Sequence, residues 1–540
     1  MRVLGICLVS FTLAAGCSSS RARGNGNGNG NGLSDGGTPD LAPIVQMNQV
    51  VIATGAPANA PSLFGGPNDL ASAPSLVYPP DGVLMPPNLN ELEVQFTAAA
   101  GTTLFEIGFI SPALALKIYT PCVPVGSGCG FEPDAMTWKA LSDAGRGGPM
   151  QVTLRATSMS GGPVGSAAPR TISFTDEDLL GGLYYWAAAS GAVNRYDFGL
   201  RGQKAESFYT PAQSGATCVG CHVLSRDGSR IAVGLNIPGP ATLRLLDVAT
   251  RTTLYESAGG PGASGGSNFE ALSPDGAEVL ANLGNDLALY NAQTGAALGA
   301  SPAIANATMP DWSADGARVV FARSGTSTPC FGGICPVNPG VDTASLFLSQ
   351  VSGTSFGAPT QLVSGGASNN NYYPSFSPDG AFVAFNRSTQ NSYDAPDAKV
   401  MVVPVSGGAP VDLGAVNAQA GNSWPKFAPF VQHYQGKTIF WLTFSSRRDY
   451  GLRLVNSAQS DPKNQIAQLW MVAVSPDRLS QAGDAGYPPF WLPFQDLSTG
   501  NHIAQWTQTV ARQPCTPGPD EMCGVNEVCM NGVCVPQTIQ

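Results

Sequence analysis

The stretch Leu224–Gly234, LSRDGSRIAVG, has three close copies further along the chain, and it decides how the central region folds. In each copy a serine precedes Asp-Gly by two residues, and alternating apolar residues follow the glycine. Asp-Gly favours a tight turn, and alternation with a period of two is typical of a half-buried strand. Each copy therefore predicts a turn that leads into a β-strand. The other copies begin at Leu272 (LSPDGAEVLAN), Trp312 (WSADGARVVFA) and Phe376 (FSPDGAFVAFN).

The spacing of the copies predicts a β-propeller. Their serines, Ser225, Ser273, Ser313 and Ser377, are 48, 40 and 64 residues apart. Repeats of about 40 to 50 residues are typical of four-stranded propeller blades. We therefore expect a propeller over residues 179–510, in which the repeat aspartates form turns and do not bind metal or catalyse a reaction.

These copies resemble the PD40 repeats of the TolB-type propeller family. FSSRRDYG, residues 444–451, resembles a late-blade segment of that family, with Arg448 where aspartate is usual. WPKFAP, which begins at Trp424, looks like a degenerate fifth copy. Residues 182–198 (GLYYWAAASGAVNRYDF) and 468–475 (QLWMVAVS) would share a further blade, which makes six. The resemblance implies a role in binding a protein or a ligand, and it brings no catalytic residues.

The composition agrees with an all-β fold and excludes one class of partner. Only 12% of the residues are charged, while glycine (65 residues) and proline (44 residues) are abundant, as expected for short strands joined by many turns. The net charge is −10 and no basic cluster occurs, so we do not expect nucleic acid as a partner.

A smaller β domain is predicted before the propeller, over residues 75–178. ELEVQFT (residues 91–97) and MQVTLRATS (residues 150–158) alternate apolar and polar residues, as half-buried antiparallel strands do. A region of this size predicts an immunoglobulin-like or fibronectin-like sandwich.

The N-terminus predicts export and a lipid anchor. Residues 1–17 combine Arg2 with a short apolar run, which is typical of a signal peptide. LAAGC, ending at Cys17, resembles a bacterial lipobox, although Leu13 lies four residues before the cysteine and Ala14 stands where leucine is usual. The alternative is an ordinary signal peptide that is cut elsewhere. We expect a protein of the cell envelope, attached to the membrane only through this lipid, with a disordered Gly/Asn/Pro-rich tether over residues 18–74.

Most of the other cysteines form local groups that predict disulfides. Cys122 with Cys129 and Cys330 with Cys335 are the candidate pairs within the two domains. Residues 511–540 form a small module that is too short to have a core of its own. Two bridges with three open connectivities are expected there, or alternatively a zinc site, among Cys515, Cys523, Cys529 and Cys534.

The sequence Cys218-Val-Gly-Cys221-His222 resembles a c-type haem attachment site. In such a site two thiols bond to the haem vinyl groups and the histidine ligates iron. The alternatives are a Cys218–Cys221 disulfide, or a metal or redox pair. A thioredoxin-like pair is disfavoured, because VLSRDG after the motif predicts a turn and a strand where such a pair requires the start of a helix.

The phase of the repeats suggests where this motif lies. Counting back four residues from each repeat serine gives Cys221, Phe269, Met309 and Tyr373, and the degenerate copy gives Trp424. Equivalent positions in a propeller surround one axis, so a haem on Cys221 would meet these side chains, with Met309 as the sixth iron ligand. The alternative is ordinary packing between blades. The remaining histidines, His433 and His502, are expected to be structural or surface residues.

The sequence thus predicts an envelope lipoprotein whose propeller mouth binds envelope proteins or a small ligand, with one haem c for electron transfer or redox sensing. A haem-dependent periplasmic oxidoreductase is the second hypothesis, and a haem-free structural or interaction propeller is the third. No set of residues has the spacing of a Ser-His-Asp triad or of a metal hydrolase.

Overall fold

The computed structural model describes residues 46–536 with several gaps. Cys17, the signal peptide, residues 18–45 of the predicted tether, and the pair Cys330 and Cys335 lie outside the described residues. The gaps are residues 90, 200–203, 236–241, 258–268, 284–285, 325–339, 394, 482–483, 517–522 and 524–526.

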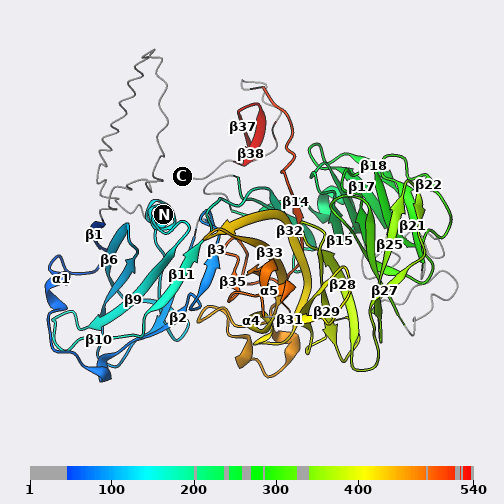
Figure 1. Cartoon of the computed structure of the whole chain (residues 1–540). Coiled ribbons are helices and arrows are strands. Elements are labelled where there is room, and N and C mark those ends of the chain that lie inside the picture. The colour runs from blue at the N-terminus through cyan, green and yellow to red at the C-terminus, as the bar shows by residue number, and fades with distance from the viewer. Residues whose placement is uncertain are drawn as a thin grey trace, which may run out of the picture. The chain divides into compact units, whose positions relative to one another are not determined.

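The N-terminal domain is a sandwich of two sheets, as predicted (Figure 1). The rings of Phe96 and Phe105, from opposite sheets, lie 4.7 Å apart in the shared core. The first sheet has the order β1 (Met47–Ile52), β6 (Leu114–Pro121), β5 (Leu104–Ile110), β9 (Pro149–Thr157), β11 (Arg170–Phe174) and β3 (Val83–Met85), and β10 (Gly165–Ser166) pairs with β9. The second has the order β2 (Ser75–Tyr78), β4 (Val94–Thr97), β8 (Gly128–Phe131) and β7 (Val123–Val125). The helical elements here are α1 (Ala60–Leu63), η1 (Leu70–Ser72) and α2 (Ala135–Ala144).

Two details of the sandwich differ from the sequence-based prediction. The tether boundary at residue 74 is wrong, because β1 pairs with β6 and α1 and η1 follow it. The strands are also not all antiparallel, since β1 with β6 and β3 with β11 are parallel pairs. Both differences arise from pairing between distant segments, which local alternation does not reveal.

Six further sheets form the propeller, which confirms the predicted all-β fold. Blades one and two consist of β14 (Glu206–Tyr209), β13 (Ala192–Asp197), β12 (Gly182–Ala187) and β36 (Asn501–Thr507), and of β15 (Val219–Leu224), β16 (Arg230–Leu235), β17 (Thr242–Asp247) and β18 (Thr253–Glu256). Blades three and four consist of β19 (Glu270–Leu272), β20 (Glu278–Leu283), β21 (Asp286–Asn291) and β22 (Ala297–Leu298), and of β23 (Thr308–Trp312), β24 (Arg318–Arg323), β25 (Ser345–Ser352), β26 (Ser355–Phe356) and β27 (Thr360–Val363). Blades five and six consist of β28 (Asn370–Phe376), β29 (Phe382–Ser388), β30 (Lys399–Pro404) and β31 (Val411–Asp412), and of β32 (Asn422–Tyr434), β33 (Lys437–Ser446), β34 (Gln468–Val474) and β35 (Phe490–Trp491). Short helices α3 (Pro211–Ser214), α4 (Gly414–Asn417), η2 (Asn456–Ala458), η3 (Pro462–Asn464) and α5 (Pro476–Ser480) lie in the loops.

The ring closes through a late strand. The inner strands β36, β15, β19, β23, β28 and β32 contact one another in that order, and β32 contacts β36. β36 pairs with β12, so the first blade is completed by residues 501–507. The predicted partner, residues 468–475, was wrong, because that segment forms β34 within the sixth blade.

Each repeat turn is held by its own serine and aspartate. The four serine hydroxyls donate to the aspartate two residues on at 2.5–2.7 Å, and they accept from the backbone N–H five residues on at 2.9–3.0 Å. The glycines that follow the aspartates have φ between 68° and 79°, which other residues rarely adopt. Hydrogen bonds from Ser273 and Ser313, together with backbone N–H groups, lower the pKa of Asp275 and Asp315. The repeat aspartates therefore form turns.

The sandwich and the propeller share one hydrophobic cluster and an ion pair. Arg453, in the loop between β33 and β34, donates two hydrogen bonds from Nε and one from Nη2 to the carboxylate of Glu93 at 2.6–2.9 Å. The side chain of Gln95 accepts from the backbone N–H of Leu452 at 2.6 Å. The two domains therefore pack as one body.

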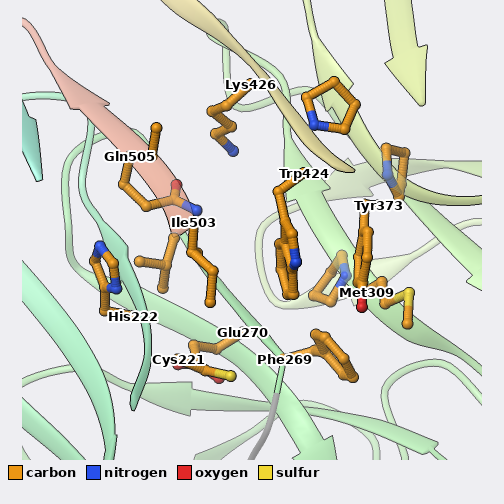
Figure 2. Close-up of a pocket in the computed structure, with 15 residues that line it drawn as sticks. Cys221, His222, Phe269, Glu270, Met309, Tyr373, Trp424, Lys426, Ile503 and Gln505 are labelled. Atoms are coloured by element: carbon orange, nitrogen blue, oxygen red, sulfur yellow. The ribbon is translucent and has the colours of Figure 1, made fainter. Parts of the chain in front are cut away.

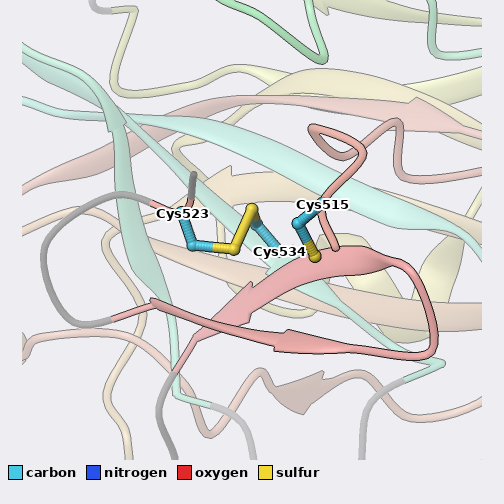
Figure 3. Close-up of side chains that lie close together, drawn as sticks. All are labelled: Cys515, Cys523 and Cys534. Atoms are coloured by element: carbon cyan, nitrogen blue, oxygen red, sulfur yellow. A yellow bond between two sulfur atoms is a disulfide. The ribbon is translucent and has the colours of Figure 1, made fainter. Parts of the chain in front are cut away.

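Disulfides join three pairs of cysteines in the described part of the chain. Cys122–Cys129 closes the β7–β8 hairpin, as predicted. The C-terminal hairpin of β37 (Glu527–Met530) and β38 (Val533–Pro536) carries Cys515–Cys529 and Cys523–Cys534, which selects one of the three connectivities. Figure 3 shows the Cys523–Cys534 bridge with Cys515 nearby. The sulfurs of Cys515, Cys523 and Cys534 lie close together because the two bridges are neighbours, which argues against the zinc alternative.

None of the helices in the described residues has the length and apolar character that a bilayer-spanning segment requires.

Candidate functional site

A hollow on the propeller axis contains the five side chains that repeat phase singled out. Figure 2 shows Cys221, Phe269, Met309, Tyr373 and Trp424 around it. Each lies on or immediately before a different inner strand, close to the end at which these strands begin, which we call the mouth. The prediction that equivalent positions surround one axis is confirmed.

The sixth member of the ring, Ile503 on β36, was missed. Its segment, Ile503–Thr507, has threonine where the four clear repeats have serine, and no Asp-Gly follows. The only signal was the phase itself, since Ile503 lies four residues before Thr507. We refer to these six side chains as the mouth ring.

Backbone strain is concentrated in the mouth ring. Met309, Tyr373, Trp424 and Ile503 have φ between 49° and 55°. At each of them the pairing with the neighbouring strand shifts register, as in a β-bulge. A left-handed conformation costs a bulky residue on the order of 1–3 kcal/mol, and such strain is typical of functional sites. Because a bulge changes the direction of a side chain, the fold accepts this cost in order to direct large groups at the axis.

Aromatic side chains fill much of the hollow. The rings of Tyr373 and Trp424 are stacked with centroids 3.7 Å apart, and Phe269 lies 5.9 Å from each of them. The remaining cavity is about 60 Å³, which is room for a few water molecules. A larger ligand would therefore lie against the outer side of this aromatic layer, at the mouth.

Charged groups lie deeper along the axis. Lys426 forms an ion pair with Asp311, whose other oxygen accepts from the backbone N–H of Phe376 at 2.7 Å. The guanidinium of Arg226 crosses to the carbonyls of Pro378 and Pro429, at 3.3 and 3.2 Å. Burial lowers the pKa of Arg226, and the negative charge of Asp311 opposes this shift. Lys426 lines the hollow, whereas the Arg226 contacts lie at the turn end of the axis.

The two thiols of the Cys-x-x-Cys-His motif are not bonded to each other. Cys221 is half-buried, and burial raises its pKa to about 12. Cys218 immediately precedes β15 next to the side chain of Trp186, and burial also raises its pKa. Both sulfurs are therefore protonated at neutral pH and lack the thiolate character of a redox-active pair.

His222 is buried, with 3% of its surface exposed, and it carries no charge at neutral pH. Burial lowers its pKa to about 4, and the nearby backbone of Tyr184 and Gly220 only partly opposes the shift. Neither ring nitrogen has a partner in hydrogen-bonding geometry. In Figure 2 the imidazole lies on the side of Gln505, while the Cys221 thiol points towards Phe269.

The residue types of the motif are those of a c-type haem site, but the hollow beside Cys221 has room for only a few water molecules and the His222 imidazole lies on another side of it. Two unbonded thiols and a neutral imidazole with two unengaged nitrogens are the groups that such a haem requires. Met309 lies in the same ring but is 3% exposed and packs with Phe269 and Tyr373.

The other two histidines are placed as follows. His433 lies outside the hollow, where its Nδ1 is 2.7 Å from Glu177. His502 lies on β36 with its ring centroid 5.9 Å from that of Trp186.

Comparisons with known proteins add the following. No family model and no curated protein matches the chain. Among solved structures, TolB from Acinetobacter baumannii has 13% identity over 66% of this chain and 79% of its own, with a TM-score of 0.38. A nidogen/laminin complex has 9% identity over 61% and 99%, with a TM-score of 0.37. The dihydro-heme d1 dehydrogenase NirN has 15% identity over 55% and 61%, with a TM-score of 0.30. Because these similarities are so distant, the assignment of the fold rests on the sheet order described above.

Proposed function

We propose that this chain is an exported, lipid-anchored recognition protein of the cell envelope, whose propeller binds a partner protein or a small ligand at the mouth. The observation that carries the proposal is the mouth ring. Five large side chains and the Cys221 thiol, one from each blade, line a single hollow, and four of these residues have a strained backbone. Such a convergence of apolar groups in a concave site is typical of ligand binding.

The chemistry of the hollow favours binding over catalysis. Cys221 is a protonated thiol, His222 is neutral and buried, and Lys426 is paired with Asp311. None of these three groups is both in the protonation state of a nucleophile or general base and accessible to a substrate.

Co-purification with matched tryptophan variants tests this role. The full chain, Trp424→Ala and the control Trp312→Phe are each isolated from the envelope with their bound molecules. Trp312 lies at the other end of β23, where its indole donates to the carbonyl of Gly316 at 3.0 Å. We expect species bound by the wild type and by the control to be lost from Trp424→Ala. Retention of every bound species by Trp424→Ala would contradict the proposal.

A second proposal is that Cys218, Cys221 and His222 attach one haem c at the mouth. It is supported by the unengaged donor set, and it goes beyond a simple binding propeller. When bound, the haem would supply reversible one-electron chemistry for electron transfer or redox sensing. Cys218 and Cys221 would hold it covalently, His222 would ligate the iron, and Met309 is the predicted sixth ligand.

Intact mass from a host with cytochrome c maturation tests the haem proposal. We expect the mass of one haem to be added to the wild type and to the control Trp312→Phe, and the thioether-bonded haem to be lost or incompletely bonded in Cys221→Ser. A visible spectrum of the reduced protein should show the α and β bands of haem c only where the mass increment is found. A haem-free wild type from that host would refute the second proposal and leave the first unaffected.

A further inference from the structure

Several arginines of the blades are paired with carboxylates, whereas three arginines at the mouth end of their strands are not. Arg230 on β16 lies 2.6 Å from Asp247, and Arg244 on β17 lies 2.7 Å from Glu256. Arg323, Arg387 and Arg448 instead bind only neutral acceptors among the described residues. The chain has 37 acidic residues against 27 lysines and arginines, so a shortage of carboxylates does not explain the difference.

Strand register places these three arginines at the mouth end of their blades, outside the residues that line the hollow. Arg387 on β29 pairs with Asn371, two residues before Tyr373 of the mouth ring. Arg323 ends β24, and its neighbour Ala322 pairs with Thr308, one residue before Met309. Arg448 follows β33, whose last residue pairs with Asn422, two residues before Trp424. A cation thus lies at or just after the end of the second strand in blades four, five and six.

Stacking and hydrogen bonds fix the guanidinium groups in place. Arg323 lies 4.9 Å from the ring of Phe347 and donates from Nη2 to the carbonyl of Ala305 at 3.0 Å. Arg448 is buried, stacked on Phe444 and Trp470, and donates from Nη2 to the carbonyl of Val416 and the side chain of Asn422. Fixed cations lose little conformational entropy when they bind a ligand.

Arg387 has the most suitable geometry for an anion. It is half-buried over Phe385, and its Nε donates to Asn371 Oδ1 at 2.9 Å. That bond leaves the terminal nitrogens Nη1 and Nη2 without an acceptor among the described residues. Asp412 is the carboxylate that acts on Arg387, but it is itself bound by Lys399 and Asn417. A guanidinium held in this way presents a fork that matches a carboxylate or a phosphate.

Burial without a counter-ion is costly for a cation. It lowers the pKa of Arg323 and of Arg387, and it lowers that of Arg448 to about 9. A bound anion would compensate this cost.

We infer that the mouth binds its ligand through a carboxylate or phosphate group, with Arg387 as the principal donor and Arg323 as the second. This inference rests on the proposed recognition at the mouth and specifies the chemistry of the ligand. The anion belongs either to a small molecule or to acidic side chains of a partner protein.

Calorimetric titration of the full chain tests the inference with three probes: inorganic phosphate, citrate and a hexaglutamate peptide. The variants are Arg387→Gln, Arg387→Lys and, as a matched control, Arg230→Gln. We expect at least one probe to bind the wild type and Arg230→Gln alike, and its Kd to rise roughly tenfold or more in Arg387→Gln. The Kd of Arg387→Lys should lie between those of the wild type and Arg387→Gln, because lysine keeps the charge but lacks the two parallel donors of the guanidinium. Added salt should weaken binding to the wild type. Binding of phosphate or citrate would indicate a small ligand, and binding of the peptide alone an acidic partner segment.

Two results would overturn the inference. One is that no probe binds the wild type, and the other is that a probe binds Arg387→Gln as tightly as Arg230→Gln. If the Trp424-dependent co-purification still succeeds in either case, recognition at the mouth stands and only its anionic character is refuted.

Discussion

The two ends of the inner strands differ in how closely the blades repeat the same residues. At the turn end, four blades repeat one arrangement, in which serine, aspartate and glycine satisfy one another in a relaxed turn. At the mouth end, the six blades present different side chains, and four of those sit on strained backbone. The turn end is uniform because it forms the fold. The variation at the mouth end agrees with the recognition proposed there.

The sharpest test of this comparison sets a mouth tryptophan against a core tryptophan. Trp441 of β33 is fully buried, and its indole donates to Gln432 at 2.7 Å, so Trp441→Ala should lower the free energy of unfolding by about 3–5 kcal/mol. Trp424 is half-buried on strained backbone, so Trp424→Ala should cost less than about 2 kcal/mol. Urea unfolding of both variants measures the difference. Equal losses would mean that the mouth ring is ordinary core.

A second test concerns the turn end. Gly228 has a φ of 79°, and a Cβ there would lie 2.2 Å from the carbonyl oxygen of Thr509. Gly228→Ala should therefore cost about 2–4 kcal/mol, through the left-handed conformation and the clash. Gly353 has a φ of 56° but open space around it, so Gly353→Ala should cost only about 1 kcal/mol. Thermal denaturation followed by circular dichroism compares them, and similar Tm values would show that the turn end tolerates change.

The smallest expected effect is a pH dependence at the turn end. Hydrogen bonds from Ser313 and the backbone of Ala317 lower the pKa of Asp315 below its ordinary value of 3.8. The folded state thus favours the charged form, and this contribution is present above pH 3.8 and lost as the pH falls through the lower folded value. Asp315→Asn should lack that part of the acid sensitivity. Unfolding midpoints at pH 7 and pH 3 check this, and identical pH profiles for both proteins would contradict it.

Repeat phase predicted much of the site because the turn end fixes the register of each inner strand. Counting from Ser313 or Ser377 reached the correct residues even where the backbone bulges. The phase of β36 was hidden because Thr507 replaces the serine and no Asp-Gly follows. β1 was missed because all six of its residues are exposed, so no apolar alternation marks it. The sequence does not mark the mouth arginines, because only the fold shows that no carboxylate among the described residues pairs with them.

The closure by β36 has a consequence for the order in which the molecule is built. Residues 501–507 pair with residues 182–187, more than three hundred positions earlier, so the first blade waits for the end of the chain during synthesis or refolding. Until then β12 presents a bare edge, which invites pairing with other chains. Ile503 arrives with the same strand, so the wall of the hollow is completed in the step that closes the ring. A chain that ends before residue 501 would therefore have an incomplete mouth ring and an unpaired β12 edge that promotes aggregation.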